Sequence, residues 1–349
     1  MSLSKNNIAL VILNFDSNEY LSALLNSLSN QSSNHFTTFL VDNYSPINPE
    51  EKLKDLYPNV NFIRNKSNLG YSGGYNKIIS ELTSRGWELF LLVNPDIIFP
   101  DDSIEVLLNE YEKLRNQIGN EIGLVQPAIL RPDGRINTLG NVYNIFGYGW
   151  CMQDGDTLPT ILDTKEINSV SGSCLLVDGR SFLEIGGFDE DFFAYAEDQE
   201  LSMRMKFIKK KHFVVMKSRV IHCHIFNKNR KKWFFIERNR WKIILTYYSL
   251  KTIILILPLL LLFEIMIILF SIKNHFFRYK LMSYYSNLIT FKKIVKKRRL
   301  IQSVRQMNDS AFISTCQNNW YYSQLKLPNK IIFLSRLQAL YLRMILKYI

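Results

Sequence analysis

Cysteine is scarce in this 349-residue sequence, and the few cysteines are far apart. No two of the four have the close spacing that zinc-binding motifs or disulfide frameworks use, so we expect free thiols in a reducing cytoplasm. Residues 1–5 run straight into a strand-like segment, so we expect no signal peptide. The cysteines are Cys151, Cys174, Cys223 and Cys316.

Two common phosphate-binding signatures are also absent from the sequence. There is no G-x-x-x-x-G-K-[ST] loop, and the glycine cluster at Gly70, Gly73 and Gly74 lacks the G-x-G-x-x-G spacing of dinucleotide-binding proteins. Glycines allow the backbone to approach a ligand closely. They equally suit a tight turn from a strand into a helix, and both interpretations can apply here.

Acidic residues are rare in the last third of the chain. Residues 1–224 contain 20 Lys and Arg against 28 Asp and Glu, a net charge of −8. Residues 225–349 contain 23 against 3, a net charge of +20. This asymmetry indicates two unlike parts and an anionic partner for the basic part. The length allows a catalytic domain with a full core, followed by an appendage.

Polar side chains follow several apolar runs of strand length, at the point where each run ends. Residues 89–93 stop at Asn94-Pro95-Asp96, which is the clearest case, although Asn-Pro-Asp is also a common turn. Helical patterns lie between the runs, so we predict an α/β fold with a mainly parallel sheet. The polar strand ends then converge on one ligand cleft. The other junctions are Asn14 after 8–13, Asp42 after 36–41 and Asn65 after 60–63.

An ordered set of motifs over roughly residues 7 to 225 resembles the glycosyltransferases of family 2. The resemblance is strongest to the rhamnosyltransferase-type branch of bacterial surface polysaccharide synthesis, and it implies the GT-A nucleotide-sugar fold. We therefore expect a catalytic domain over residues 1–225 and a basic, partly hydrophobic helical region over residues 226–349. The motifs are Asp42-Asn43-Tyr44-Ser45, Asn68-Leu69-Gly70-Tyr71-Ser72-Gly73-Gly74-Tyr75-Asn76, Asn94-Pro95-Asp96, Ser171-Gly172-Ser173-Cys174, Gly186-Gly187-Phe188-Asp189-Glu190, Glu197-Asp198, Arg204 and His222.

A transferase of this kind releases a nucleoside diphosphate, and a carboxylate-held Mg²⁺ or Mn²⁺ can neutralise its growing charge. Asp96 is the candidate ligand. The resemblance implies that His222 completes the metal site or contacts the diphosphate, although a lone histidine after a strand is often structural. The usual two-carboxylate motif is reduced to Asn94 and Asp96, as is common in the resembling branch. Asn94 would then orient ligands or donor hydroxyls.

The pair Glu197-Asp198 is the candidate for proton removal from the acceptor hydroxyl. The pair follows an aromatic run and opens a helical pattern, so its carboxylates would be kept anionic by the helix N-terminus and made more basic by desolvation. Ordinary helix capping is the alternative. We assign Asp198 as the base and Glu197 to acceptor binding or helix orientation, and the two could exchange roles.

The donor and the acceptor each have further candidate residues. Asp42 can accept a hydrogen bond from a pyrimidine ring N–H, and Asn14 lies beside it in the predicted sheet. The resemblance places the loop of Gly172 and Ser173 on the acceptor side, together with Arg204. The remaining donor-side candidates are Asn68, Gly73 and Asn76.

The basic region contains one membrane-like segment. Residues 252–272 are almost entirely apolar, interrupted by Pro258 and Glu264, and both flanks are basic. A single crossing would leave one basic flank outside, so we expect a peripheral or re-entrant helix on anionic lipid at the cytoplasmic face of the bacterial inner membrane. Residues 331–345 suggest a second amphipathic helix. Both segments could instead pack on the catalytic domain. Nucleic acid is not expected, because no recognition motif occurs.

These expectations combine into an inverting, metal-assisted transferase. We expect it to move a sugar from a nucleotide-diphosphate donor, dTDP-rhamnose first, onto a lipid-linked glycan for O-antigen or capsule. UDP-linked galactofuranose, galactose or N-acetylhexosamine stay open as donors. The alternative classes are a nucleotidyltransferase, for which the N-terminal segment lacks a basic phosphate-gripping loop, and a non-catalytic membrane adaptor that retains the fold.

Overall fold

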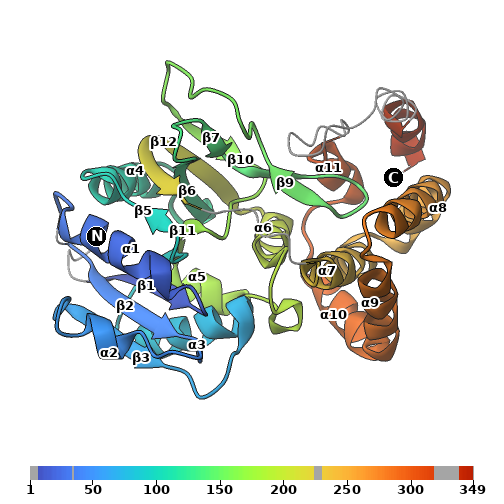
Figure 1. Ribbon diagram of the computed structural model, residues 1–349. Helices are drawn as coiled ribbons and strands as arrows, with labels where there is room; N and C mark the ends of the chain where they lie inside the picture. Colours follow the sequence, from blue (N-terminus) through green and yellow to red (C-terminus); the bar gives the residue numbers. More distant parts are fainter. Residues whose placement is uncertain (1–6, 34, 224–229, 318–337, 349) are drawn as a thin grey trace. The chain divides into compact units, whose positions relative to one another are not determined.

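The computed structural model describes residues 7–33, 35–223, 230–317 and 338–348 (Figure 1). The chain divides into two compact units, which are described separately. Unit 1 comprises Met1–Asn141, Cys151–Lys206 and Lys210–Ile225. Unit 2 comprises Val142–Trp150, Phe207–Lys209 and Phe226–Ile349.

Unit 1 is built on one mixed sheet with the strand order β10-β12-β6-β11-β4-β1-β2-β3. Strands β4, β1, β2 and β3 run parallel, whereas β11 runs antiparallel to both β4 and β6. Strand β2 lies on one side of β1 and β4 on the other, and the carboxyl ends of strands at such a switch point are where open α/β sheets bind ligands. The strands are β1 (Ile8–Asn14), β2 (Thr37–Asp42), β3 (Val60–Arg64), β4 (Leu89–Val93), β5 (Ile97–Ile98), β6 (Ile122–Leu130), β7 (Ile136–Thr138), β10 (Thr164–Ile167), β11 (Cys174–Asp178) and β12 (Lys211–His222).

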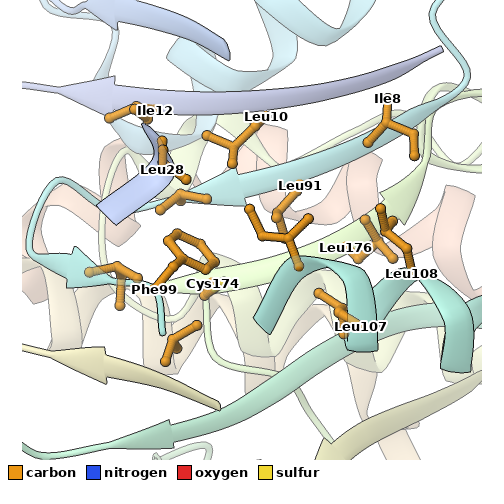
Figure 2. Close-up of a cluster of buried hydrophobic side chains, with 14 of the residues drawn as sticks. Ile8, Leu10, Ile12, Leu28, Leu91, Phe99, Leu107, Leu108, Cys174 and Leu176 are labelled. Carbon is orange, nitrogen blue, oxygen red and sulfur yellow. The ribbon is translucent and has the colours of Figure 1, made fainter. Parts of the chain in front are cut away.

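Helices cover both faces of this sheet, as the apolar run of each central strand requires. In β1 alternate side chains point to opposite faces. Ile8, Leu10 and Ile12 pack with α1 and α4, as Figure 2 shows for this cluster, whereas Ala9 and Val11 pack with α3, α5 and α6. The helices of unit 1 are α1 (Asn18–Ser29), α2 (Glu50–Leu53), α3 (Gly70–Ser84), α4 (Ser103–Ile118), α5 (Gly179–Glu184) and α6 (Glu197–Phe207).

This architecture confirms the predicted α/β fold with a mainly parallel sheet and a helical C-terminal region. Burying one Leu, Ile, Val or Phe side chain stabilises a fold by roughly 1.5–3 kcal/mol. The five residues of β4 are all buried, so this strand is held from both faces. The rigid strand therefore fixes where Asn94 and Asp96 emerge.

Unit 2 is mainly helical and includes most of a small two-stranded β8–β9 ribbon. Four of its charged side chains, Glu237, Arg240, Glu264 and Lys280, form a buried cluster. Arg240 and Lys280 each contact both carboxylates at distances between 2.6 and 3.0 Å. The elements are β8 (Asn141–Tyr143), β9 (Gly149–Cys151), α7 (Lys232–Tyr247), α8 (Leu250–Lys273), α9 (Phe277–Ile289), α10 (Phe291–Val304) and α11 (Asp309–Ser314).

Helix α8 contains the membrane-like segment of the sequence. It is the one helix among the described residues that is long and apolar enough to cross a membrane. One stripe of the helix is buried in unit 2, including Ile256, Leu260 and Glu264, and every exposed side chain between Lys251 and Lys273 is apolar. Part of the predicted second amphipathic helix, residues 331–337, lies outside the described residues, and residues 338–345 are helical.

Candidate active site

The strand register gathers the predicted polar residues at one edge of the sheet of unit 1. Asn14 pairs with Asp42 across β1 and β2, and both side chains are buried. Val93 pairs with Cys174, which brings the start of β11, and therefore Gly172 and Ser173, to the end of β4. His222 pairs with Ile97 and so lies next to Asp96. The edge thus combines the amide–carboxylate pair of Asn14 and Asp42 with a glycine turn. It also carries the carboxylate and imidazole of Asp96 and His222, called here the metal-type pair because these groups are common metal ligands.

Asp96 and His222 face each other with Oδ2 and Nε2 3.3 Å apart, and 14% of each side chain is exposed. Nδ1 of His222 lies 3.0 Å from Oδ1 of Asn137, in β7. An amide oxygen can only accept a hydrogen bond, so Nδ1 carries the proton and donates to Asn137. Nε2 is the nitrogen that faces Asp96. One imidazole nitrogen and one carboxylate oxygen are suitable donors for Mn²⁺ or Mg²⁺.

This pair could hold only part of a cation's coordination shell. The described ranges contain no group of three or more His, Cys, Asp or Glu side chains arranged around a common point. Phosphate oxygens and water would have to supply the remaining ligands, which is usual for Mg²⁺ in nucleotide-binding sites. The residues therefore fit a cation that binds together with a diphosphate.

Asn137 was not identified as a site residue from the sequence. Its Nδ2 lies 3.5 Å from Oδ1 of Asp154, which forms an ion pair with Arg131 at 2.5 Å. The carboxylate favours the amide orientation that presents Oδ1 to His222. A hydrogen-bond partner of this kind fixes the tautomer and ring orientation of a metal-binding histidine. No pattern in the sequence around Asn137 indicates its contact with His222, because that contact depends on the pairing of β7 with β6.

At the ends of β1 and β2, Asp42 is already well supplied with hydrogen bonds. It accepts from the Asn14 amide at 3.2 Å and from the Ser45 backbone N–H, and it forms an ion pair with Arg64 at 2.8 Å. Oδ1 of Asn14 is buried and receives no hydrogen bond within the described part of the chain. That oxygen is a ready acceptor for an N–H or hydroxyl of a ligand. Arg64 was not singled out in the sequence.

The glycine-rich motif is organised by Asn43, which the sequence suggested only as part of a motif. Its amide donates to Oδ1 of Asn68 at 3.1 Å and to the carbonyl of Gly70 at 2.9 Å. Oδ1 of Asn68 also accepts from the Gly70 N–H at 2.8 Å. Asn68, a donor-side candidate, therefore uses its amide oxygen to shape the turn into α3.

Three other candidates lie away from the edge cluster. Asn76 bonds to the backbone of Phe188 in both directions, at 2.8 and 2.9 Å, and with Gly73 it lines a hollow of about 490 Å³ beside α5. Arg204 donates to the carbonyls of Ile185 and Gly187, both at 2.6 Å, and pairs with Glu200 at 2.8 Å. The side chains of Asn76 and Arg204 therefore hold the backbone around the Gly186-Gly187 turn.

Glu197 and Asp198 open helix α6, and both lie in buried surroundings. Asp198 accepts from the Gly172 N–H at 2.8 Å and from the Gln199 N–H at 2.7 Å. Oε2 of Glu197 is buried and has no hydrogen-bond partner among the described residues. The preceding Phe193, Tyr195 and Ala196 all have positive φ angles, between 62° and 68°. Left-handed backbone costs free energy for such residues, and strain of this kind is concentrated at functional sites.

The two carboxyls hold their protons more tightly than usual. Burial raises the pKa of Glu197 from 4.5 to about 8, and the charge of Asp198 adds to this rise. Burial also raises the pKa of Asp198, while the N–H groups of Gly172 and Gln199 act in the opposite direction. Burial and the neighbouring charge thus favour the protonated form of Glu197, while the two backbone N–H groups favour the anionic form of Asp198.

We expect the Glu197→Gln variant to be more stable than the wild type, with a gain that grows as the pH rises from about 4.5 towards 8. Over this range the folded wild type retains a proton that the unfolded chain has lost, so its free energy of unfolding falls with pH. Glutamine carries no such proton. Thermal melts of both proteins across this range measure the difference. A difference in Tm that does not vary with pH would contradict the protonation assigned to Glu197.

Comparisons with known proteins find similar glycosyltransferases. Residues 9–120 match the model of glycosyl transferase family 2. The N-acetylglucosaminyl-diphospho-decaprenol L-rhamnosyltransferase of Mycobacterium tuberculosis is 27% identical over 219 residues, covering 57% of this chain and 70% of the relative. The low-salt glycan biosynthesis hexosyltransferase Agl10 of Haloferax volcanii is 25% identical over 209 residues, covering 57% of this chain and 61% of that protein.

A solved structure shares the fold. The crystal structure of GalNAc-T7 with UDP, GalNAc and Mn²⁺ aligns with a TM-score of 0.57 and 14% identity, over 70% of this chain. The alignment covers 48% of the GalNAc-T7 chain, less than half of its length. This likeness confirms the GT-A-like fold predicted from the motifs.

Proposed function

We propose that this chain is a family 2 glycosyltransferase that transfers rhamnose from dTDP-rhamnose onto a lipid-linked glycan at the cytoplasmic face of a bacterial inner membrane. The observation that carries the proposal is the arrangement of two pairs at one sheet edge. Asp96 and His222 form a metal-type pair, and Glu197 and Asp198 form a buried carboxyl pair joined to the same edge through Gly172. One pair suits a leaving diphosphate and the other an attacking hydroxyl.

In the proposed reaction, the acceptor hydroxyl oxygen attacks the anomeric carbon while the bond from that carbon to the diphosphate oxygen breaks. The hydroxyl proton passes to the carboxylate of Asp198, and the bonding electron pair leaves with the diphosphate. Attack opposite the leaving group inverts the anomeric centre. A divalent cation bound by Asp96 and His222 supplies charge neutralisation for the diphosphate.

Donor binding is assigned to the ends of β1 and β2. We assign Asn14 and Asp42 to the nucleoside and Asn94 to donor hydroxyls. Gly172 and Ser173 border the acceptor side, because they precede β11 next to Asp198. The mycobacterial relative supports a rhamnose donor and a lipid-linked acceptor, since it is named an N-acetylglucosaminyl-diphospho-decaprenol L-rhamnosyltransferase.

The donor is tested by incubating the purified protein with Mn²⁺, a polyprenyl-diphosphate-linked N-acetylglucosamine and single nucleotide sugars. We expect a product heavier by one deoxyhexose with dTDP-rhamnose, detected by mass spectrometry. Transfer from UDP-galactose, UDP-galactofuranose or a UDP-N-acetylhexosamine instead would overturn the rhamnose assignment and keep the transferase. The absence of transfer from every donor would favour the non-catalytic adaptor.

We assign membrane association to residues 226–349. Three features of unit 2 support this. The region carries a net positive charge, the exposed side chains of α8 between Lys251 and Lys273 are all apolar, and Glu264 is paired inside the unit with Arg240 and Lys280. An exposed apolar helix face next to basic residues is typical of binding to anionic lipid surfaces.

Neutralising exposed basic residues of α10, with Lys292, Lys296 and Arg299 all changed to Gln, is expected to weaken binding to anionic vesicles. Each basic residue near such a surface contributes about 1 kcal/mol, so the triple variant should bind on the order of 100-fold more weakly. Co-sedimentation with phosphatidylglycerol-containing vesicles measures this. The matched control changes Lys52, Lys66 and Arg180, which are exposed in unit 1, to Gln. Equal binding by both triple variants would contradict the assignment.

A further inference from the structure

Tyr71, the second residue of α3, contacts both segments that lead to the carboxyl pair. Its phenol hydroxyl donates to the carbonyl of Gly172 at 2.6 Å. Its backbone N–H donates to the carbonyl of Phe193 at 2.7 Å. The ring is held edge-on against Tyr75 and Phe188, with centroid distances of 4.7 and 5.3 Å. Tyr71 therefore has a fixed position from which both of its donors reach across to other parts of unit 1.

Each contacted segment is linked to one of the two carboxyl groups. The Gly172 segment is linked by a hydrogen bond, and the Phe193 segment is linked along the chain. Gly172 donates its N–H to Oδ2 of Asp198 at 2.8 Å. Phe193 begins the strained segment that ends at Ala196, immediately before Glu197. The phenol of Tyr71 and the carboxylate of Asp198 thus hold the two sides of the same glycine, one through its carbonyl and the other through its N–H.

The packing around this glycine leaves no room for a side chain. A Cβ atom on Gly172 would lie 2.9 Å from the hydroxyl of Tyr71 and 3.3 Å from Cβ of Asp198. A Cβ on Gly70 would lie 2.5 Å from the carbonyl oxygen of Phe193. Contacts below 3.0 Å force atoms to move. Tyr71 is therefore interlocked with both segments by shape as well as by hydrogen bonds.

We propose that Tyr71 is a positioning residue for the catalytic base, and that its hydroxyl fixes Gly172 so that the Gly172 N–H stays on the carboxylate of Asp198. The proposal rests on the assignment of Asp198 as the base under the proposed function. The hydrogen bond from the Gly172 N–H stabilises the anionic carboxylate of Asp198. This is the form that can take the proton from the hydroxyl of the sugar acceptor. Tyr71 does not touch the reacting atoms in this scheme.

Several groups around Asp198 influence its protonation. Glu197 precedes it in α6, and Tyr71 and Cys151 interact with it electrostatically. The Asn141 amide lies 3.5 Å from Oδ2. Burial raises the pKa of Asp198, and the hydrogen bond from the Gly172 N–H lowers it more than any other contact does. If Gly172 moves away, the pKa of Asp198 rises further, and the base is protonated up to a higher pH.

The test is the pH dependence of kcat/KM for the Tyr71→Phe variant. We expect the acidic limb of the profile to move to higher pH and kcat/KM at neutral pH to fall about two- to tenfold, the equivalent of one hydrogen bond. Donor affinity should not change, because the donor-side residues keep their contacts. Tyr75→Phe is the matched control: it lies in the same helix and loses a buried hydroxyl that donates to the Val93 carbonyl at 3.0 Å.

A purely structural role for Tyr71 would leave the acidic limb in place, or would move it equally in the Tyr75→Phe control, and either result would overturn the proposal. This failure is distinguishable from a failure of the proposed function. If Asp198→Asn abolishes transfer while Tyr71→Phe keeps the wild-type profile, only the positioning role is wrong. If Asp198→Asn retains transfer, the assignment of the base is wrong and the positioning role falls with it.

A double-variant cycle tests the interlock without relying on pH. Gly172→Ala should lower kcat/KM, because the new Cβ collides with the Tyr71 hydroxyl. Adding Tyr71→Phe removes the colliding oxygen, so the double variant should recover part of the lost activity instead of losing more. Thermal melts confirm that each variant is folded. Strictly multiplicative losses would contradict the interlock, because residues in contact give non-additive effects.

Discussion

Asp198→Asn is expected to lower kcat by about 10²- to 10⁴-fold while donor affinity stays at the wild-type value. Asparagine preserves the size of the side chain and can still accept the hydrogen bond from Gly172. It cannot take a proton from the acceptor hydroxyl. Initial rates at saturating donor, together with donor titrations followed by calorimetry, separate the two effects.

The alternative for Asp198 is a helix-terminal role, which would affect stability instead of rate. Asp178 provides the comparison, because it caps α5 by accepting from the Ser181 N–H at 2.8 Å and lies outside the carboxyl pair. We expect Asp178→Asn to retain transfer. If Asp198→Asn lowers only the Tm, as a capping substitution would, the assignment of Asp198 as the base is wrong.

Asp96→Ala is expected to remove the dependence of donor binding on Mn²⁺ and to weaken metal-dependent donor affinity by about 100-fold or more. Substituting a residue that hydrogen-bonds to a metal ligand typically lowers metal affinity 10- to 100-fold. Removing the ligand itself should lower metal affinity by more than that. Alanine leaves the imidazole of His222 as the remaining side chain of the metal-type pair. Electron paramagnetic resonance of free and bound Mn²⁺, with and without dTDP, measures the affinity directly.

Asp133→Ala is the control for the removal of one carboxylate, since Asp133 is exposed in the turn after β6. This variant should bind donor and Mn²⁺ as the wild type does. An Asp96→Ala protein with an unchanged response to Mn²⁺ would contradict the role of Asp96 as a ligand. Wild-type protein that binds donor equally well with and without a divalent cation would contradict metal assistance altogether.

The fold and the sheet edge that carries the polar residues could be predicted from the sequence because they depend on short-range patterns. The apolar run before Asp96 has the length of a buried strand, and the polar residue after each run marks a carboxyl end. Since parallel strands present these ends on one edge, Asn14, Asp42 and Asp96 were expected there, and the register brings them there. The unbroken apolar run of residues 8–13 is likewise typical of a strand that is covered on both faces.

The supporting contacts could not be predicted, because they join residues that are distant in sequence. Tyr71 meets Gly172 across 101 positions, and Asn137 meets His222 across 85. Such contacts depend on strand order and loop packing, so no pattern of residue spacing in the nearby sequence indicates them. Motif membership is also a limited guide: Arg204 and Asn76 belong to motifs of the family, yet their side chains bond to backbone groups of the turn before η2 (Glu190–Phe192).

The most direct test of a metal-assisted nucleotide-sugar site at this sheet edge is a thermal-shift screen. It would measure the Tm of the wild type and of Asp96→Ala against dTDP-, UDP- and GDP-sugars, with and without Mn²⁺. A ligand at 100 times its Kd stabilises the folded state by about 2.7 kcal/mol. We expect one dTDP- or UDP-sugar to raise the wild-type Tm only when Mn²⁺ is present, and to have no such effect on Asp96→Ala. A shift that is the same without Mn²⁺, or the same in Asp96→Ala, would contradict this site.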